Sequence, residues 1–224
     1  MLITMWAGVS VSVLQILWFV LGVLLPTFFW FWFFWRRDPK PEPVRLLIRT
    51  FLYGAFAYLP AALFELSMQT ALTGMALYIF IAVVEELLKY FATRTVVKER
   101  DFDEFIDGLI YSMTAALGFA LMENIFYGVS FGMEVLLVRG LITMSSHVLF
   151  TAPWGFALGY QRMRNHNKYA VPLGLGIGIV LHSVFNGIQI QSHPTWGVIA
   201  LVMALVTVMF LVADRLYTTA SKEP

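Results

Sequence analysis

Two adjacent glutamates, Glu85 and Glu86, lie in the middle of an apolar stretch and are followed one helical turn later by Lys89. The stretch, residues 73 to 96, is long enough to cross a bilayer. A charge at the centre of a membrane helix costs roughly 2.5 to 3.5 kcal/mol on insertion scales. Ionisable side chains at such a position therefore indicate a buried polar site that faces other helices and serves catalysis or the passage of ions.

Further polar side chains interrupt the apolar stretches that follow. They are Glu123, Asn124, His147, His182 and Asn186. Glu85, His147 and His182 each lie near the middle of a stretch, so we expect the three side chains at one depth in the membrane. Polar groups of four helices at similar depth are typical of a shared site rather than of packing.

The spacing of these residues predicts which of them share a helix face. Residues four apart lie on the same face, which places Glu85 over Lys89 and His182 over Asn186. Glu85 and Glu86 diverge by about 100°. We therefore expect one glutamate to pair with Lys89 and the other to face a cavity.

The inventory of side chains favours direct attack by water. The chain has no cysteine, and it lacks the His-Glu-x-x-His motif of zinc proteases and a Gly-x-Ser-Gly nucleophile. A glutamate can take a proton from water, while His and Asn donate hydrogen bonds to the oxyanion. Two carboxylates and two imidazoles could also hold a divalent ion, but we expect neither a metal nor another cofactor.

Composition indicates an all-α, polytopic membrane helix bundle. Hydrophobic residues make up 59% of the 224 residues and charged residues only 13%, against about 25% charged in soluble domains. The apolar stretches predict seven transmembrane helices at about 9–35, 45–66, 73–96, 104–128, 134–160, 170–191 and 195–216. We expect one transmembrane domain, 1–224, whose motifs lie within about 45–190. With a net charge of +1, the partner is the lipid bilayer and not nucleic acid.

Basic residues predict the orientation of the bundle. They concentrate in the loops after the first, third and fifth stretches, so the positive-inside rule places the N-terminus outside and the C-terminus in the cytoplasm. Arg139 is the exception, and near the outer end of its helix it could snorkel to the interface. Glu123 and Asn186 lie nearer the outer face, so a cavity that joins them to Glu85 would open outward.

The ordered motifs resemble those of a known family. They are Glu85-Glu86-x-x-Lys89, Phe119-x-x-x-Glu123-Asn124, the isolated His147 and His182-x-x-x-Asn186. In this order, and on successive helices, they are similar to the motifs of the PrsW family of bacterial membrane proteases, which are distant relatives of the CAAX prenyl endopeptidases and the Abi proteins. The resemblance covers residues 45 to 190.

The resemblance implies a glutamate-dependent intramembrane protease of the bacterial plasma membrane. Its substrate would be a single-span membrane protein, an anti-sigma factor cut near its extracytoplasmic side under envelope stress. The implied roles are Glu85 as base, Glu86 as its support or the partner of Lys89, and His182 with Asn186 as oxyanion donors. The CAAX pattern has a histidine where this chain has Glu123, so His147 is the candidate for that histidine's role, and Asn124 is expected to support the site.

Other functions fit parts of the same pattern. A CAAX-type endopeptidase would act on lipidated C-termini, which an outward-facing site disfavours. A proton-coupled transporter could use the same Glu, His and Lys residues, but the chain shows no convincing similarity between its halves. A non-enzymatic immunity or scaffold protein with a vestigial site is the third alternative.

Overall fold

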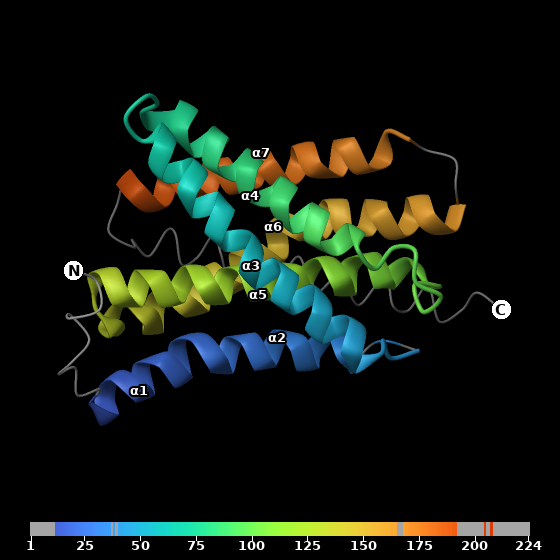
Figure 1. Cartoon of the computed structure of the whole chain (residues 1–224), viewed down its shortest axis with the longest axis horizontal. Coiled ribbons are helices and arrows are strands. Elements are labelled where there is room, and N and C mark those ends of the chain that lie inside the picture. Colours follow the sequence, from blue (N-terminus) through green and yellow to red (C-terminus); the bar gives the residue numbers. More distant parts are fainter. Residues whose placement is uncertain are drawn as a thin grey trace.

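A computed structural model describes residues 12–36, 38, 40–164, 168–191, 204 and 207. These residues form a bundle of helices (Figure 1). In chain order the elements are α1 (Val13–Phe19), the π-helical turn η2 (Val20–Leu24), α2 (Leu25–Trp35), α3 (Val44–Met68), α4 (Gly74–Arg94), α5 (Phe105–Phe131), the 3₁₀ turn η3 (Met133–Val135), α6 (Leu136–Arg164) and α7 (Ala170–Gln191). The all-α class predicted from the sequence is confirmed.

Six of the seven predicted stretches coincide with helices of the structure, with ends that differ by a few residues. The seventh, 195–216, falls outside the described residues except for 204 and 207. Within the described part of the chain, five helical segments are long and apolar enough to cross a membrane. They are Val13–Trp35, Val44–Met68, Phe105–Phe131, Arg139–Arg164 and Ala170–Ile188. The helix α4 has a similar length but is not among the five, because it carries the charged residues Glu85, Glu86 and Lys89.

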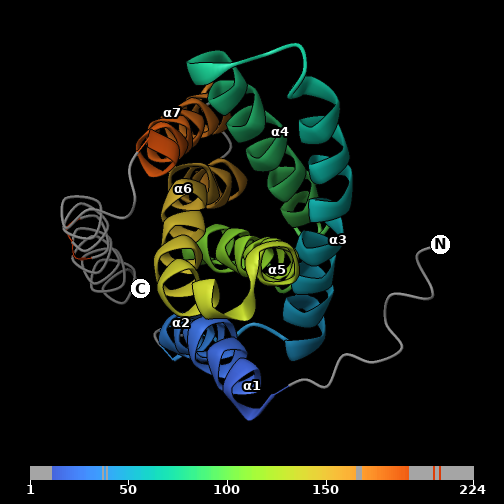
Figure 2. The same cartoon turned by 90° about the vertical axis from the view of Figure 1, so that its left-hand side faces the viewer.

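The helix α5 is the central element of the bundle. Viewed along the helices, α5 lies in the middle, with α2, α3, α4, α6 and α7 around it (Figure 2). Small residues allow this close approach: a Cβ at Gly54 of α3 would lie 2.0 Å from the carbonyl oxygen of Ala115, and one at Gly118 would lie 2.0 Å from that of Phe51. The backbones of α3 and α5 therefore touch, as small residues permit in membrane proteins.

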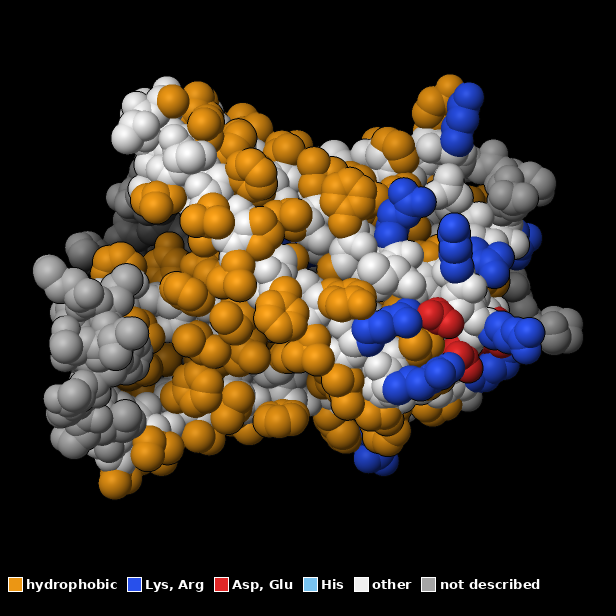
Figure 3. Space-filling model, viewed as in Figure 1, with side chains coloured by type: hydrophobic (Ala, Val, Ile, Leu, Met, Phe, Trp, Pro, Cys, Tyr) orange, Lys and Arg blue, Asp and Glu red, His pale blue; other side chains and the backbone are white. Residues whose placement is uncertain are grey.

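The charged side chains gather at one end of the molecule. Figure 3 shows Lys and Arg at the right-hand end, whereas hydrophobic side chains cover much of the remaining visible surface. In the same view, α2, α4 and α6 end there (Figure 1). We call this the basic end. Ion pairs such as that of Arg49 with Glu99, at 2.8 Å, tie α3 to the loop between α4 and α5 there.

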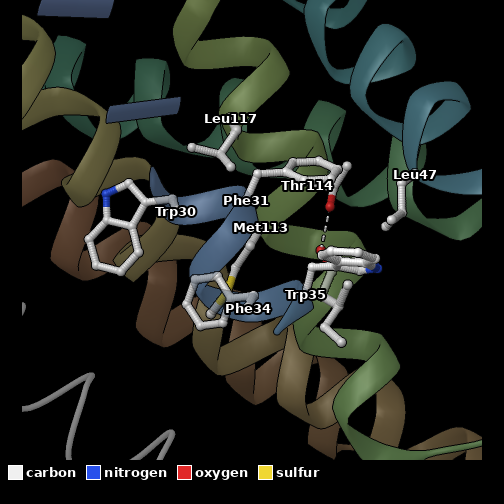
Figure 4. A pocket seen from close by; sticks show the side chains of 9 residues that line it. Trp30, Phe31, Phe34, Trp35, Leu47, Met113, Thr114 and Leu117 are labelled. Carbon is white, nitrogen blue, oxygen red and sulfur yellow. Dashed lines mark hydrogen bonds between the residues drawn. The ribbon is translucent and has the colours of Figure 1, made fainter. Parts of the chain in front are cut away.

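An apolar pocket lies on the α2 side of α5. Trp30, Phe31, Phe34 and Trp35 of α2 line it together with residues of α3 and α5 (Figure 4). The one hydroxyl in its lining, that of Thr114, donates to the carbonyl oxygen of Ile110 within α5 at 2.7 Å. The pocket thus has no titratable side chain and belongs to the packing of the bundle.

Buried carboxyl groups hold the segment before α3 against the start of α5. Glu42 is buried, and Tyr111 donates a hydrogen bond to its Oε2. Asp38 accepts hydrogen bonds from the backbone N–H groups of Lys40, at 3.0 Å, and Glu42, at 3.2 Å. Burial raises the pKa of Glu42 to about 9, and the neighbouring Asp107 carboxylate contributes in the same direction. Glu42 is therefore protonated in the folded chain at neutral pH.

We predict that Glu42→Gln stabilises the protein at alkaline pH. A carboxyl whose pKa rises from 4.5 to about 9 on folding favours the folded state below pH 4.5, and this contribution is lost as the pH rises toward 9. A glutamine side chain has nearly the same size as the glutamate that it replaces, but it does not titrate. Thermal unfolding in detergent should show a similar midpoint for both proteins at pH 5. At pH 8 the variant should be more stable by at least about 1 kcal/mol, or about 2–4 °C.

The exposed Glu134 provides the control, since Glu134→Gln should leave the pH dependence of the midpoint unchanged. If the Glu42 variant and the unmodified protein lose stability equally between pH 5 and pH 8, this account of the carboxyl groups is incorrect.

Candidate active site

Polar side chains from four helices meet inside the bundle. We call them the polar cluster: Glu85, Glu86, Lys89, Glu123, His147 and His182. The glutamates Glu85 and Glu86 and the lysine come from α4, Glu123 from α5, His147 from α6 and His182 from α7. The groups contact one another directly, and the outward-opening cavity that the sequence suggested stays a prediction.

Lys89 is the centre of the polar cluster. Its side chain is 0% exposed, and its Nζ donates to Glu85 Oε2 at 3.2 Å, to Glu86 Oε1 at 2.9 Å and to His147 Nδ1 at 2.8 Å. The ammonium also lies 4.5 Å from the centre of the Phe119 ring. The expectation that only one glutamate pairs with Lys89 is wrong, because the long side chain reaches carboxylates at both the third and the fourth preceding position.

These contacts fix the proton position on His147. An ammonium group can only donate, so His147 Nδ1 accepts from Lys89 through its lone pair. The other ring nitrogen, Nε2, lies 2.7 Å from Glu123 Oε2. A neutral imidazole protonated at Nε2 satisfies both contacts, because it donates to Glu123 and accepts from Lys89.

Glu86 fixes His182 in the same way. Glu86 Oε1 accepts from Lys89, and its Oε2 accepts from Trp154 Nε1 at 2.9 Å. His182 Nδ1 lies 3.0 Å from Glu86 Oε1 and donates to it, since a carboxylate holding these donors is an acceptor. The ring of Phe150 stacks on His182 with 4.6 Å between ring centroids. In this arrangement a neutral His182 presents the lone pair of Nε2 toward Glu85 Oε2, 3.7 Å away.

The two glutamates of α4 consequently differ in what they can do. Both oxygens of Glu86 hold hydrogen bonds, and its side chain is 0% exposed. Glu85 Oε2 holds a single long bond from Lys89 and lies 3.7 Å from His182 Nε2 and 3.9 Å from His147 Nδ1. Glu85 is thus the carboxylate that faces the imidazoles, whereas Glu86 anchors the surrounding groups.

Glu123 is held from its other side by Arg139. The Arg139 Nη2 lies 2.5 Å from Glu123 Oε1, and the guanidinium lies 3.3 Å from the centre of the Tyr127 ring. Arg139 therefore turns inward and does not snorkel as the sequence suggested. The signal for this pairing was the arginine itself, since a charge in an apolar stretch needs a partner of opposite sign.

The two asparagines lie outside this network. The amide of Asn124 is buried and donates to the carbonyl oxygen of Ala120 at 2.8 Å and to Thr143 Oγ1 at 2.9 Å. Asn186 is half-buried, one turn after His182 on α7. Among the described residues no hydrogen bond links either asparagine to the polar cluster, so their support of the site stays a prediction.

Sequence reasoning missed two further groups at the site. Trp154, six residues before the predicted end of its helix, gave no signal, because a tryptophan in a membrane helix usually serves packing. Glu65 on α3 lies within hydrogen-bonding reach of Glu85. As an acidic residue near the end of an apolar stretch, Glu65 could have been noted.

The donor set of the polar cluster fits a divalent metal ion. Donor atoms of Glu85, His147 and His182 lie within 4.8 Å of one another. The far nitrogen of each imidazole is held by a carboxylate, Glu123 or Glu86, which is the arrangement that orients histidines at metal sites. Two of the three donor atoms, those of Glu85 and His147, already bind the Lys89 ammonium, a resident cation.

Comparisons with known proteins identify the family of the chain. Residues 42–213 match the family described as "PrsW family intramembrane metalloprotease". Proteins named "Protease PrsW" are 31% identical in Oceanobacillus iheyensis, over 69% of this chain and 74% of the relative, and 31% in Bacillus subtilis, over 70% and 73%. The relative of that name in Clostridioides difficile is 30% identical, over 85% of this chain and 88% of the relative. No solved structure matches the chain.

We predict that Lys89→Met destabilises the folded protein strongly. The change leaves the buried carboxylates of Glu85 and Glu86 without their shared cation, and breaking a buried ion pair costs about 3–5 kcal/mol. Thermal unfolding in detergent measures this. Lys98→Met serves as the control, because Lys98 lies at an exposed position of the basic end. It should leave the unfolding midpoint unchanged. Equal midpoints for the two variants would contradict the central place of Lys89.

Proposed function

The chain belongs to the PrsW family and is an intramembrane protease of a bacterial membrane, and we propose that it cuts single-span membrane proteins near their extracytoplasmic side. The substrate we propose is an anti-sigma factor. The observation that carries the proposal is the position of Glu85, a buried carboxylate that faces the lone pair of His182 across 3.7 Å. A water molecule can donate one hydrogen bond to each of these two acceptors.

The proposed orientation places the basic end in the cytoplasm. Lys and Arg gather at that end (Figure 3), in agreement with the positive-inside rule. With seven crossings in one domain, the N-terminus would then be outside and the C-terminus cytoplasmic. The Arg139–Glu123 pair, near the start of α6, would lie toward the extracytoplasmic side of the polar cluster.

In the proposed reaction, water attacks the peptide carbonyl carbon while Glu85 takes one of its protons. His182 Nε2 accepts a hydrogen bond from the same water and so aims its oxygen. The C–N bond then breaks, and the proton held by Glu85 passes to the departing amine. The products are a carboxylic acid and an amine. The acid gives up its remaining proton to the amine or to water, and Glu85 is restored. The Lys89 ammonium, 3.2 Å from Glu85, supplies positive charge beside the developing oxyanion.

This assignment changes one role inferred from the sequence. His182 was expected to donate to the oxyanion together with Asn186. The hydrogen bond from His182 Nδ1 to Glu86 leaves a lone pair at Nε2, so His182 acts as an acceptor in this arrangement. We propose that Asn186 alone, one turn further along α7, supplies the amide donor, and that Glu86 keeps His182 in place.

A metal-dependent form of this reaction is the second candidate, favoured by the donor set and by the description of the family. Glu85, His147 and His182 would hold the ion. When bound, a divalent ion lowers the pKa of its water and polarises the carbonyl. In both forms Glu86 and Glu123 orient the histidines through the same hydrogen bonds.

We predict that Glu85→Gln and Glu86→Gln each reduce cleavage at least ~100-fold, the lower range for loss of general-base catalysis. Glutamine keeps the size but neither takes a proton nor holds His182 by charge. The assay uses the purified chain in liposomes with a tagged single-span substrate, and gel analysis follows the product. The exposed Glu134→Gln is the control. Undiminished cleavage by both α4 variants would rule out this mechanism.

We also predict that chelation leaves cleavage intact, because the Lys89 ammonium already binds two of the three prospective donor atoms. The measurement combines cleavage after treatment with EDTA or 1,10-phenanthroline with the metal content of the purified protein. Loss of cleavage that zinc restores would instead establish the metal-dependent form. Cleavage of lipidated C-terminal peptides in the same liposomes would indicate a CAAX-type substrate.

A further inference from the structure

Arg139 is a half-buried charge that the proposed reaction does not use. Its side chain is 14% exposed, and its partner Glu123 is 13% exposed. The guanidinium binds Glu123 Oε1 at 2.5 Å on one side and lies over the Tyr127 ring at 3.3 Å on the other. Removing a guanidinium from water in this way costs free energy, which its ion pair with a carboxylate must offset. It lies two helical turns before His147 on the same helix, α6.

The ion pair leads directly to His147. Glu123 binds Arg139 through Oε1 and His147 Nε2 through Oε2, the latter at 2.7 Å. Because Arg139 only donates, it holds the carboxylate with Oε1 turned to the guanidinium and Oε2 turned to the imidazole. Glu123 in turn keeps the proton of His147 on Nε2.

This proton position matters at the other face of the ring. His147 Nδ1 lies 2.8 Å from Lys89 Nζ and 3.9 Å from Glu85 Oε2. With the proton on Nε2, Nδ1 offers a lone pair to the centre of the polar cluster. With the proton on Nδ1, the ring would present N–H to the Lys89 ammonium, and the hydrogen bond between Lys89 and His147 would be lost.

Two groups fix this tautomer, and only one of them is independent of the reacting groups. Lys89 acts on Nδ1, but it also binds Glu85, the proposed base. Glu123 acts on Nε2 from the side away from Glu85. Any change at Glu85 during the reaction therefore perturbs Lys89, while Glu123 continues to hold the ring as long as Arg139 holds Glu123.

We propose that Arg139 is a positioning residue of the cleavage reaction: through Glu123 it keeps His147 in the tautomer protonated at Nε2. The inference rests on the proposed function, because it assumes that the polar cluster is the active site. It assigns to Arg139 a role in the reaction beyond the pairing of two helices.

The test compares Arg139→Gln and Arg139→Lys with Arg49→Gln in the full chain reconstituted in liposomes. Arg49 forms an ion pair with Glu99, at 2.8 Å, which joins α3 to the loop between α4 and α5 at the basic end. Two quantities are measured: the ¹⁵N resonances of the His147 ring in protein labelled at its histidines, and kcat and KM for the tagged substrate. The chain has four histidines, so a His147→Gln spectrum assigns the signals.

We expect Arg139→Gln to lower kcat roughly 10–100-fold, the usual effect of losing an outer-shell partner, with KM changed less than about twofold. The His147 nitrogens should shift toward a mixture of tautomers. Arg139→Lys keeps the charge, so its kcat and its His147 resonances should lie closer to those of the unmodified protein. This variant carries the test if Arg139→Gln does not fold. Arg49→Gln should change neither quantity.

Three results would overturn the inference. The first is an unchanged His147 spectrum in both Arg139 variants, and the second is a changed spectrum with unchanged kcat. The third is a loss of kcat that Arg49→Gln reproduces. These outcomes differ from failure of the proposed function, which would appear as full cleavage by Glu85→Gln with the Arg139 effect on the His147 spectrum still present.

Discussion

The Lys89 ammonium is the group on which the arrangement of the helices depends. It is fully buried, and water is not available to solvate it, so it requires acceptors from the protein. Its own helix supplies Glu85 and Glu86, and α6 supplies His147. Each of these acceptors needs further partners, which come from α5 and α7 through Glu123 and His182. Satisfying one buried cation thus brings four helices to a common point.

Close backbone contact makes this convergence possible. The side chains of the polar cluster are of fixed length, so their helices must approach within that reach. Glycines allow helices to approach closely, between α6 and α7 as well as between α3 and α5. A Cβ at Gly178 of α7 would lie 2.4 Å from the carbonyl oxygen of Phe150 in α6. Phe150 also stacks on His182. The contact that packs α7 on α6 therefore also sets the plane of the imidazole that faces Glu85.

The sequence predicted the helices and the members of the polar cluster, because both depend on local patterns. An apolar stretch of about 20 residues predicts a membrane helix, and a charge within it predicts a polar interior. The spacing of Glu85 and Lys89 predicted their contact, which is confirmed. The residue pattern did not predict the π-helical turn η2 inside the first stretch, where Gly22 lies against Gly140 of α6, because that contact joins distant segments.

Contacts between helices were beyond the reach of spacing rules. The pairing of Arg139 with Glu123 requires α5 and α6 to form a hairpin, in which Gly132 adopts a φ of 100° before η3. Likewise, the proton position on His182 follows from its contact with Glu86, whose carboxylate also accepts a hydrogen bond from Trp154. Spacing along the sequence does not predict that His182 and Trp154 meet at this carboxylate. The identity of a donor or an acceptor is a property of the assembled network, whereas the presence of a histidine is a property of the sequence.

Exposure within the site gives a direction for the approach of water and substrate. Lys89 and Glu86 have no exposed side-chain surface, Glu85 retains 5%, and Glu123 and Arg139 retain 13% and 14%. Burial thus decreases from the ammonium toward the end of the bundle opposite to the basic end. Under the proposed function, a peptide bond that approaches Glu85 from this less buried end would pass the Arg139–Glu123 pair, so the group proposed to position His147 would also border the approach.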